Sequence, residues 1–363
     1  MARPPRCFLR PAGLLAVLAA AASTSGCAGG GVTWATAEPP AVGTAGAPPP
    51  GFTADTSTRE GLASGAEASE AGCRALADGL WAGAGAGRRE CLRYAAAGTG
   101  RGPAAAQRTA LVHIGGDAAG VAYRFAGGAP QVEVAGEGYE APAGTRRAAA
   151  EALSAAAGGA PVVLLARPGM HGSSGHHARD RHTRAEVDLV DAALEELRRR
   201  HGLRGFVLSG FSSGGAVAAN LLARRGDISC AVLASAPLDL AAFYRGPDGT
   251  LPDHYAMRRG DLSDPMGTVE AVRPGTTVLV LGDPRDRKVP AAAWRAWVGA
   301  ARRAGLRVAE AEVSGSDPAE PAGAASFHRT ETSGMEAALA CAADGGGHPE
   351  AAMAARPAAL PAR

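Results

Sequence analysis

The sequence lacks an excess of charge of either sign, and it almost lacks lysine. Its 37 basic and 35 acidic residues leave a formal charge of only +2 over 363 residues. Because partners such as nucleic acids need a basic surplus, this balance predicts no nucleic-acid partner. Lys288 is the one lysine, and alanine, glycine and arginine are abundant. That bias resembles a coding preference, so a single arginine carries little functional weight.

The sequence also lacks any visible internal repeat, and its N-terminal apolar run is too short to span a membrane. Residues 12–22 (AGLLAVLAAAA) make a run of eleven, whereas a membrane-spanning helix needs about 20 residues. Arg3, Arg6 and Arg10 precede the run, which is typical of a signal peptide. We therefore expect an exported protein with its signal in residues 1–27.

Two modes of cleavage are compatible with this signal. Residues 24–27 (TSGC) resemble the lipobox of bacterial lipoproteins, in which Cys27 is lipidated, although Thr24 stands where an aliphatic residue is usual. Ordinary cleavage after residues 20–22 (AAA) is the alternative. We favour the lipobox and expect a periplasmic or cell-envelope protein whose membrane contact is a lipid anchor at Cys27.

Composition divides the rest of the chain. Residues 28–70 are mainly Ala, Gly, Pro, Ser and Thr, and such a segment buries too little apolar surface to offset its ordering entropy. This predicts a flexible linker, and the similarly simple residues 344–363 predict a disordered tail. Residues 71–343 have the length of one domain.

In that domain short apolar runs alternate with helical ones, which predicts an α/β fold with a mostly parallel central sheet and helices on both faces. The first strands can pair antiparallel, whereas the later ones need crossover helices and run parallel. Strands are expected at residues 90–95, 110–114, 162–166, 205–209, 231–235, 277–281 and 307–313, and helices at 144–157, 184–200, 214–225, 291–304 and 330–343.

A candidate nucleophile lies between an expected strand and an expected helix. Residues 210–214 (GFSSG) form a Gly-x-Ser-x-Gly motif around Ser212. Such a turn needs small neighbours because it is strained, and it exposes the serine hydroxyl above the strand end. The next backbone N–H, that of Ser213, faces the same point. A plain strand–helix connection is the competing interpretation.

Three further segments follow the order seen in the α/β-hydrolase family, which the chain resembles over residues 89–343. Residues 111–117 (LVHIGGD) are similar to the strand end that supplies an oxyanion-hole N–H, although Gly115 stands where that family has histidine. The resemblance implies Gly116 or Asp117 as donor together with Ser213, and we choose Asp117. A nucleotide-binding loop would need an ordered Gly-x-Gly-x-x-Gly motif, which is absent.

Residues 166–175 (ARPGMHGSSG) resemble the family's Gly-x-Gly-x-Ser loop, which packs beneath the active site and has a structural role. This loop and the residues after it are rich in imidazole near Asp180. The histidines have no zinc-site spacing, and we interpret them as solvated loop residues, with no metal site. They are His171, His176, His177 and His182.

Residues 282–290 (GDPRDRKVP) resemble the family segment that carries the triad acid, which implies Asp286, with Asp283 and Asp239 as alternatives. The base is then a histidine between the last strand and the last helix, where His328 lies. His254 precedes the acid and His348 falls in the tail. The order Ser212, Asp286, His328 is the order that this fold uses.

These residues predict a serine hydrolase that forms an acyl-enzyme on a small-molecule acyl substrate without metal or organic cofactor. A carboxylic ester is the expected substrate, although thioesters, lactones and peptides suit the same triad. Residues 237–275 occupy the position of a lid, in which Phe243, Tyr244, Tyr255 and Met257 line a pocket or form a small core of their own. The competing hypothesis is a surface-tethered binding protein on a catalytically idle scaffold.

Four cysteines remain in the expected domain, an even number that suits an oxidising compartment. Cys230 begins an expected strand and Cys341 ends the last helix. Strand starts and helix ends share one layer of this fold, so these two cysteines can meet. Cys73 then pairs with Cys91. Free buried thiols are the alternative, above all for Cys230.

Overall fold

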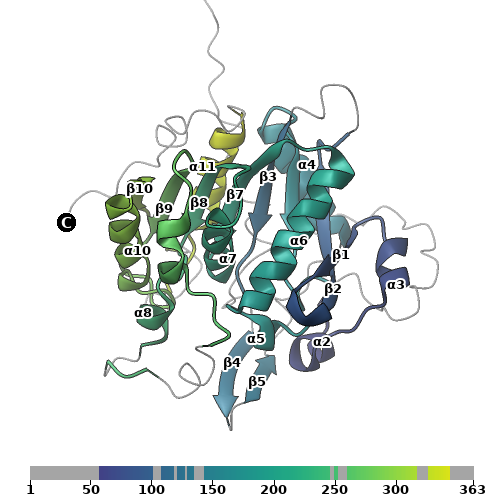
Figure 1. Ribbon diagram of the computed structural model, residues 1–363, viewed down its shortest axis with the longest axis horizontal. Helices are drawn as coiled ribbons and strands as arrows, with labels where there is room; N and C mark the ends of the chain where they lie inside the picture. Colours follow the sequence, from purple (N-terminus) through teal and green to yellow (C-terminus); the bar gives the residue numbers. More distant parts are fainter. Residues whose placement is uncertain are drawn as a thin grey trace, which may run out of the picture.

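The computed structural model describes residues 57–100, 108–117, 121–126, 129–134, 143–245, 249–251, 260–316 and 326–343. Eight strands form one sheet in the order β1-β2-β6-β3-β7-β8-β9-β10 (Figure 1). β2 pairs antiparallel with β1 and β6, and all other neighbours are parallel, as the sequence predicts. The strands are β1 (Gly79–Gly83), β2 (Arg89–Ala97), β3 (Thr109–Ile114), β6 (Val162–Leu165), β7 (Gly205–Phe211), β8 (Ile228–Ala234), β9 (Thr277–Gly282) and β10 (Arg307–Glu312).

Helices cover both faces of this sheet (Figure 1). On one face α6 (Arg184–His201), α7 (Ser213–Leu222) and α10 (Ala292–Arg303) enclose a core that includes Leu194 and Trp297. On the other face α4 (Ala143–Ala156) and α11 (Glu331–Ala343) enclose a second core that includes Leu153 and Leu339. The seven expected strands and five expected helices all form, with bounds that differ by at most three residues.

The residues at the two ends of α6 explain why its start and end can be predicted from the sequence. The hydroxyl of Thr183 accepts a hydrogen bond from the N–H of Glu186, while the Glu186 carboxylate reaches back to the N–H of His182, so donors of the first turn are satisfied. Gly202 ends the helix at a φ of 64°, a left-handed conformation in which glycine carries no Cβ penalty.

The linker predicted for residues 28–70 is wrong from residue 57 onward. α2 (Arg59–Ser64) and α3 (Glu70–Ala75) are helices, and Leu62, the large apolar residue of this segment, is only 1% exposed. One buried leucine thus anchors a segment whose composition otherwise indicates disorder. Residues 28–56, the expected signal with Cys27, and the expected tail lie outside the described residues.

The same segment hydrogen-bonds to the loop after β6. The Ser57 hydroxyl accepts from the N–H of His171 at 2.7 Å. Ala66 and Gly175 form an antiparallel bridge with N···O distances of 2.9 and 2.7 Å. The N-terminal segment therefore packs on a loop that borders the candidate site.

Other elements were not predicted. They include β1, α5 (His177–Asp180) and a separate hairpin of β4 (Val121–Ala126) and β5 (Ala129–Val134), which projects from the body in Figure 1. Within the expected lid lie α8 (Leu240–Tyr244) and the short 3-10 turns η4 (Pro265–Gly267) and η5 (Val269–Ala271). Phe243 and Tyr244 pack against each other and against His182, whereas Tyr255 and Met257 lie outside the described residues.

Two disulfides join the cysteines in the predicted pairs. Cys230 near the start of β8 is bonded to Cys341 near the end of α11, and Cys73 in α3 is bonded to Cys91 in β2. The Cα atoms lie 6.7 and 5.5 Å apart respectively. Such bonds are compatible with an extracellular protein. Within the described segments no helix is both long and apolar enough to cross a bilayer.

We expect that replacing Cys230 and Cys341 together by alanine lowers the free energy of unfolding by about 5 kcal/mol in the chain-entropy description. The bond joins residues 111 positions apart. The matched double replacement of Cys73 and Cys91, which lie 18 positions apart, should cost about 3 kcal/mol. Urea denaturation followed by circular dichroism measures both. A clearly larger loss for the short loop would contradict this ranking.

Candidate active site

Ser212 lies on the sharp turn between β7 and α7. Its φ of 51° and ψ of −128° are rare for a residue with a side chain, and such strain is typical of functional turns. The flanking positions require glycine, because there is no room for a side chain at either of them. A Cβ on Gly210 would lie 2.6 Å from the Cα of Gly215, and one on Gly214 would lie 2.2 Å from the carbonyl oxygen of Ile114.

His328 is hydrogen-bonded to this serine, and Asp286 is hydrogen-bonded to His328. His328 Nε2 is 3.0 Å from Ser212 Oγ, and His328 Nδ1 is 2.7 Å from Asp286 Oδ2. The structure therefore brings together the three residues that the sequence singles out. All three are buried, with exposed fractions of 9, 2 and 6% for the serine, histidine and aspartate.

The direction of these hydrogen bonds follows from the groups themselves. An ionised carboxylate only accepts, so Nδ1 of His328 carries the proton that faces Asp286. Nε2 is then unprotonated and faces the Ser212 hydroxyl, as a general base requires. The other oxygen of Asp286 accepts from the N–H groups of Lys288 and Val289 at 2.8 and 2.9 Å, which fixes the carboxylate.

Asp283, one alternative for the triad acid, makes hydrogen bonds elsewhere. Its fully buried carboxylate accepts from the N–H of Gly315 at 2.8 Å and from the backbone and side chain of Arg285. Burial opposes its ionisation, but the hydrogen bonds from Arg285 and Gly315 outweigh it and lower its pKa. The Gly315 carbonyl in turn accepts from the N–H of Arg329. Asp283 thus supports the loop that carries His328.

The remaining alternatives do not contact the candidate site within the described residues. Asp239 is the N-cap of α8, where its side chain accepts from the N–H of Ala242 at 2.9 Å. His254 and His348 lie outside the residues that the structure describes.

The end of β3 lies against the nucleophile. A methyl group on Gly116 would come within 3.0 Å of the Ser212 Cβ. Ser213 is the first residue of α7, where N–H groups have no carbonyl partner within the helix. The two backbone segments predicted to bind an oxyanion therefore flank Ser212. The oxyanion roles of Asp117 and Ser213 stay predictions.

A family model confirms the fold class. The model of the alpha/beta hydrolase fold matches residues 138–322, which is half of the chain. The chain belongs to the α/β-hydrolase family. No curated protein sequence matches this α/β-hydrolase.

Several solved hydrolases are similar to this α/β-hydrolase at low identity. A puromycin hydrolase is 18% identical, with a TM-score of 0.47, over 74% of this chain and 39% of that chain. An acylaminoacyl peptidase of Pyrococcus horikoshii is 13% identical, with a TM-score of 0.44, over 70% of this chain and 39% of that chain. An esterase of Pyrococcus furiosus is 14% identical, with a TM-score of 0.42, over 65% of this chain and 80% of that chain. The present chain thus spans about two fifths of the first two proteins.

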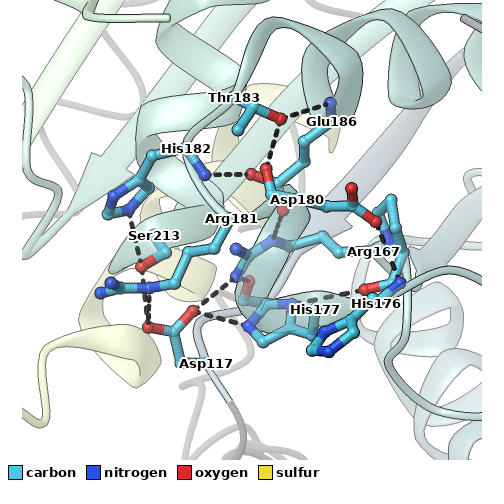
Figure 2. Close-up of polar contacts among 12 residues, drawn as sticks. Asp117, Arg167, His176, His177, Asp180, Arg181, His182, Thr183, Glu186 and Ser213 are labelled. Carbon is cyan, nitrogen blue, oxygen red and sulfur yellow. Dashed lines mark hydrogen bonds and ion pairs between the residues drawn. The ribbon is translucent and has the colours of Figure 1, made fainter. Parts of the chain in front are cut away.

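The prediction of solvated loop histidines in this α/β-hydrolase is wrong. His177 and His182 are 0 and 2% exposed, and His176 is 9% exposed. Burial and neighbouring cationic groups, first Arg146, lower the pKa of His171 to about 3. The side chains of His177 and His182 belong to a polar network with Asp117 and Ser213, the residue after the nucleophile (Figure 2). Among the described residues, no three His, Cys, Asp or Glu side chains gather closely enough to hold a metal ion.

Asp117 lies at the centre of this network. Its Oδ1 accepts from Arg167 at 3.1 Å and from His177 Nε2 at 3.0 Å, and its Oδ2 accepts from Arg181 at 2.6 Å and from the Ser213 hydroxyl at 3.0 Å. Burial opposes its ionisation, but Arg181, His177 and Arg167 outweigh that cost and hold the pKa of Asp117 well below its usual range. The network was not predicted from the sequence. The sequence feature that could have indicated the network is the high density of polar residues just before the N-cap of α6.

A second group of polar contacts fixes the start of α11. His113 Nε2 is 2.8 Å from Glu331 Oε1, and His113 Nδ1 is 3.0 Å from the hydroxyl of Ser209. The Thr330 hydroxyl donates to Ser235 at 2.8 Å. Because α11 begins three residues after His328, these contacts hold the base loop against the sheet.

Proposed function

We propose that this protein is a serine hydrolase that cleaves a carboxylic ester through an acyl-enzyme, with Ser212 as nucleophile, His328 as base and Asp286 as acid. The observation that supports this most is the series of hydrogen bonds from Asp286 through His328 to Ser212, with distances of 2.7 and 3.0 Å. The strained turn at Ser212 and the flanking backbone segments agree with the same assignment.

In the proposed mechanism Ser212 Oγ attacks the acyl carbonyl while His328 Nε2 takes the hydroxyl proton. Asp286 holds the ring and stabilises the imidazolium that forms. The developing oxyanion accepts from the N–H of Ser213 and from one N–H at the end of β3, at Asp117 in our assignment. His328 then protonates the leaving alkoxide, and a water activated by the same nitrogen hydrolyses the acyl-enzyme.

We also propose that the protein acts outside the cytoplasm. The charged and apolar segment in residues 1–22 and the two disulfides support export. Cys27 within the lipobox-like residues 24–27 is the proposed lipid anchor.

Labelling with a fluorophosphonate tests the catalytic proposal, because only an activated serine reacts at a useful rate. We expect one equivalent of label on the wild-type protein, mapped by mass spectrometry to Ser212, and hydrolysis of p-nitrophenyl acetate. The exposed Ser316 should stay unlabelled and serves as the internal control. An unlabelled and inactive wild-type protein would instead favour the idle binding scaffold. Hydrolysis of peptide anilides but not of esters would replace the ester assignment with a peptidase.

A further inference from the structure

Ser213 makes side-chain contacts that its predicted role does not require. An oxyanion donor at this position needs only a backbone N–H, yet the hydroxyl is hydrogen-bonded at both ends and the residue is 1% exposed. Its oxygen lies 3.0 Å from Asp117 Oδ2 and 3.0 Å from His182 Nε2. Figure 2 shows Ser213 between these two side chains.

The protons in this group have one consistent arrangement. Asp117 is ionised and only accepts, so the Ser213 hydroxyl donates to it. The Ser213 oxygen then accepts from His182, which places the imidazole proton on Nε2. Nδ1 of His182 is left to accept from the Tyr244 hydroxyl at 2.9 Å. The hydrogen bonds that run from Tyr244 through His182 and Ser213 to Asp117 therefore hold the Ser213 side chain in one orientation.

The arginines of the network are paired with carboxylates. Arg167 and Arg181 face the carboxylates of Asp117 and Glu186, and the Arg167–Glu186 pair is almost completely buried, with side chains 1 and 0% exposed. Paired and hydrogen-bonded charges of this kind hold one geometry, because breaking a pair leaves a buried charge uncompensated. The carboxylate of Asp117 is therefore held in place, and it can position Ser213 through their hydrogen bond.

The bond from Asp117 to Ser213 links the two segments beside the nucleophile. Gly116, on which an added Cβ would lie only 3.0 Å from the Ser212 Cβ, directly precedes Asp117, and Ser213 directly follows Ser212. One end of the bond thus belongs to the loop after β3 and the other to the first turn of α7. We propose that Asp117 is a positioning residue, whose carboxylate sets the separation of the two oxyanion-binding N–H groups through the Ser213 hydroxyl. This inference rests on the proposed serine-hydrolase function.

Ser213→Ala is the direct test, because it removes the hydroxyl and keeps the N–H. A misplaced donor costs transition-state binding more than substrate binding. We expect kcat for p-nitrophenyl acetate to fall about 10- to 100-fold while KM stays within about 2-fold. The inhibition constant of phenylboronic acid, which forms a tetrahedral adduct on the serine, should rise by a similar factor.

Two comparisons separate positioning from plain stabilisation. Ser154→Ala removes another buried hydroxyl, on α4, which donates to the Ala160 carbonyl, and we expect it to leave kcat within about 2-fold. Asp117→Asn should reproduce the Ser213→Ala loss, and the double variant should lose no more than the more impaired single variant, since both act through one bond.

Three results would overturn the inference. They are an unchanged kcat in Ser213→Ala, an equal loss of kcat in Ser154→Ala, and losses that multiply in the double variant. Each of them requires an active wild-type protein that labels at Ser212, so they differ from a failure of the proposed function, in which the wild-type protein neither labels nor turns over. That last outcome overturns both proposals.

Discussion

Ser212→Ala is expected to abolish ester hydrolysis, with kcat lowered at least about 10⁴-fold. The variant keeps the backbone donors beside the nucleophile, so substrate can still bind, but no acyl-enzyme forms. Stability should change by less than about 1 kcal/mol, because the side chain is small and its hydroxyl is hydrogen-bonded to the side chain of His328. Turnover of p-nitrophenyl acetate and thermal unfolding measure the two effects.

Two further variants make the Ser212 test sharper. Ser316→Ala changes an exposed serine and should retain full turnover. Ser212→Gly should be as inactive as the alanine variant and no less stable than it, since glycine tolerates the observed φ of 51° without a Cβ penalty. Substantial turnover in either Ser212 variant would place the nucleophile elsewhere.

Asp286→Asn is expected to lower kcat by about 10⁴-fold with little loss of stability. The amide oxygen can still accept from the N–H groups of Lys288 and Val289. Its NH2 group would then face Nδ1 of His328, which could no longer carry the proton there. The proton would move to Nε2 and the base would be lost. A kcat profile between pH 6 and 10 and urea denaturation measure the two effects.

The rival aspartates provide matched controls for this substitution. Asp239→Asn should be nearly neutral, because asparagine is as good an N-cap as aspartate and α8 is the element that Asp239 caps. Asp283→Asn should mainly reduce stability, since Asp283 binds the loop of Gly315 and does not contact His328. Near-normal turnover in Asp286→Asn, with a loss of several orders of magnitude in either rival variant, would refute the assignment.

The parts of the fold that the sequence predicts are those whose pattern is local. β7 and β9 are short apolar runs buried along their whole length, and α6 carries its own caps and an apolar stripe. The contacts of Ser212, Asp286 and His328 were also predictable, because the order of strands along the chain determines which loops meet at one edge of the sheet. Their catalytic roles stay predictions.

The parts that the sequence does not predict depend on contacts between distant segments. α2 is held by the single buried Leu62 and by partners more than a hundred residues away. The histidines at 177 and 182 look like ordinary loop residues, and only their packing against Asp117 and Ser213 makes them buried. No periodicity or spacing carries that information.

The bridge between Ala66 and Gly175 determines how far the chain can be shortened. A protein beginning at residue 71 would leave the N–H of His171 and both main-chain groups of Gly175 without the partners they have here. Each buried group left unpaired costs about 1–3 kcal/mol. The lost hydrogen bonds would destabilise the turn that leads to His177, which is hydrogen-bonded to Asp117. The shortest fragment that preserves this site therefore begins no later than Ser57. That residue lies within residues 28–70, whose composition predicts a flexible linker.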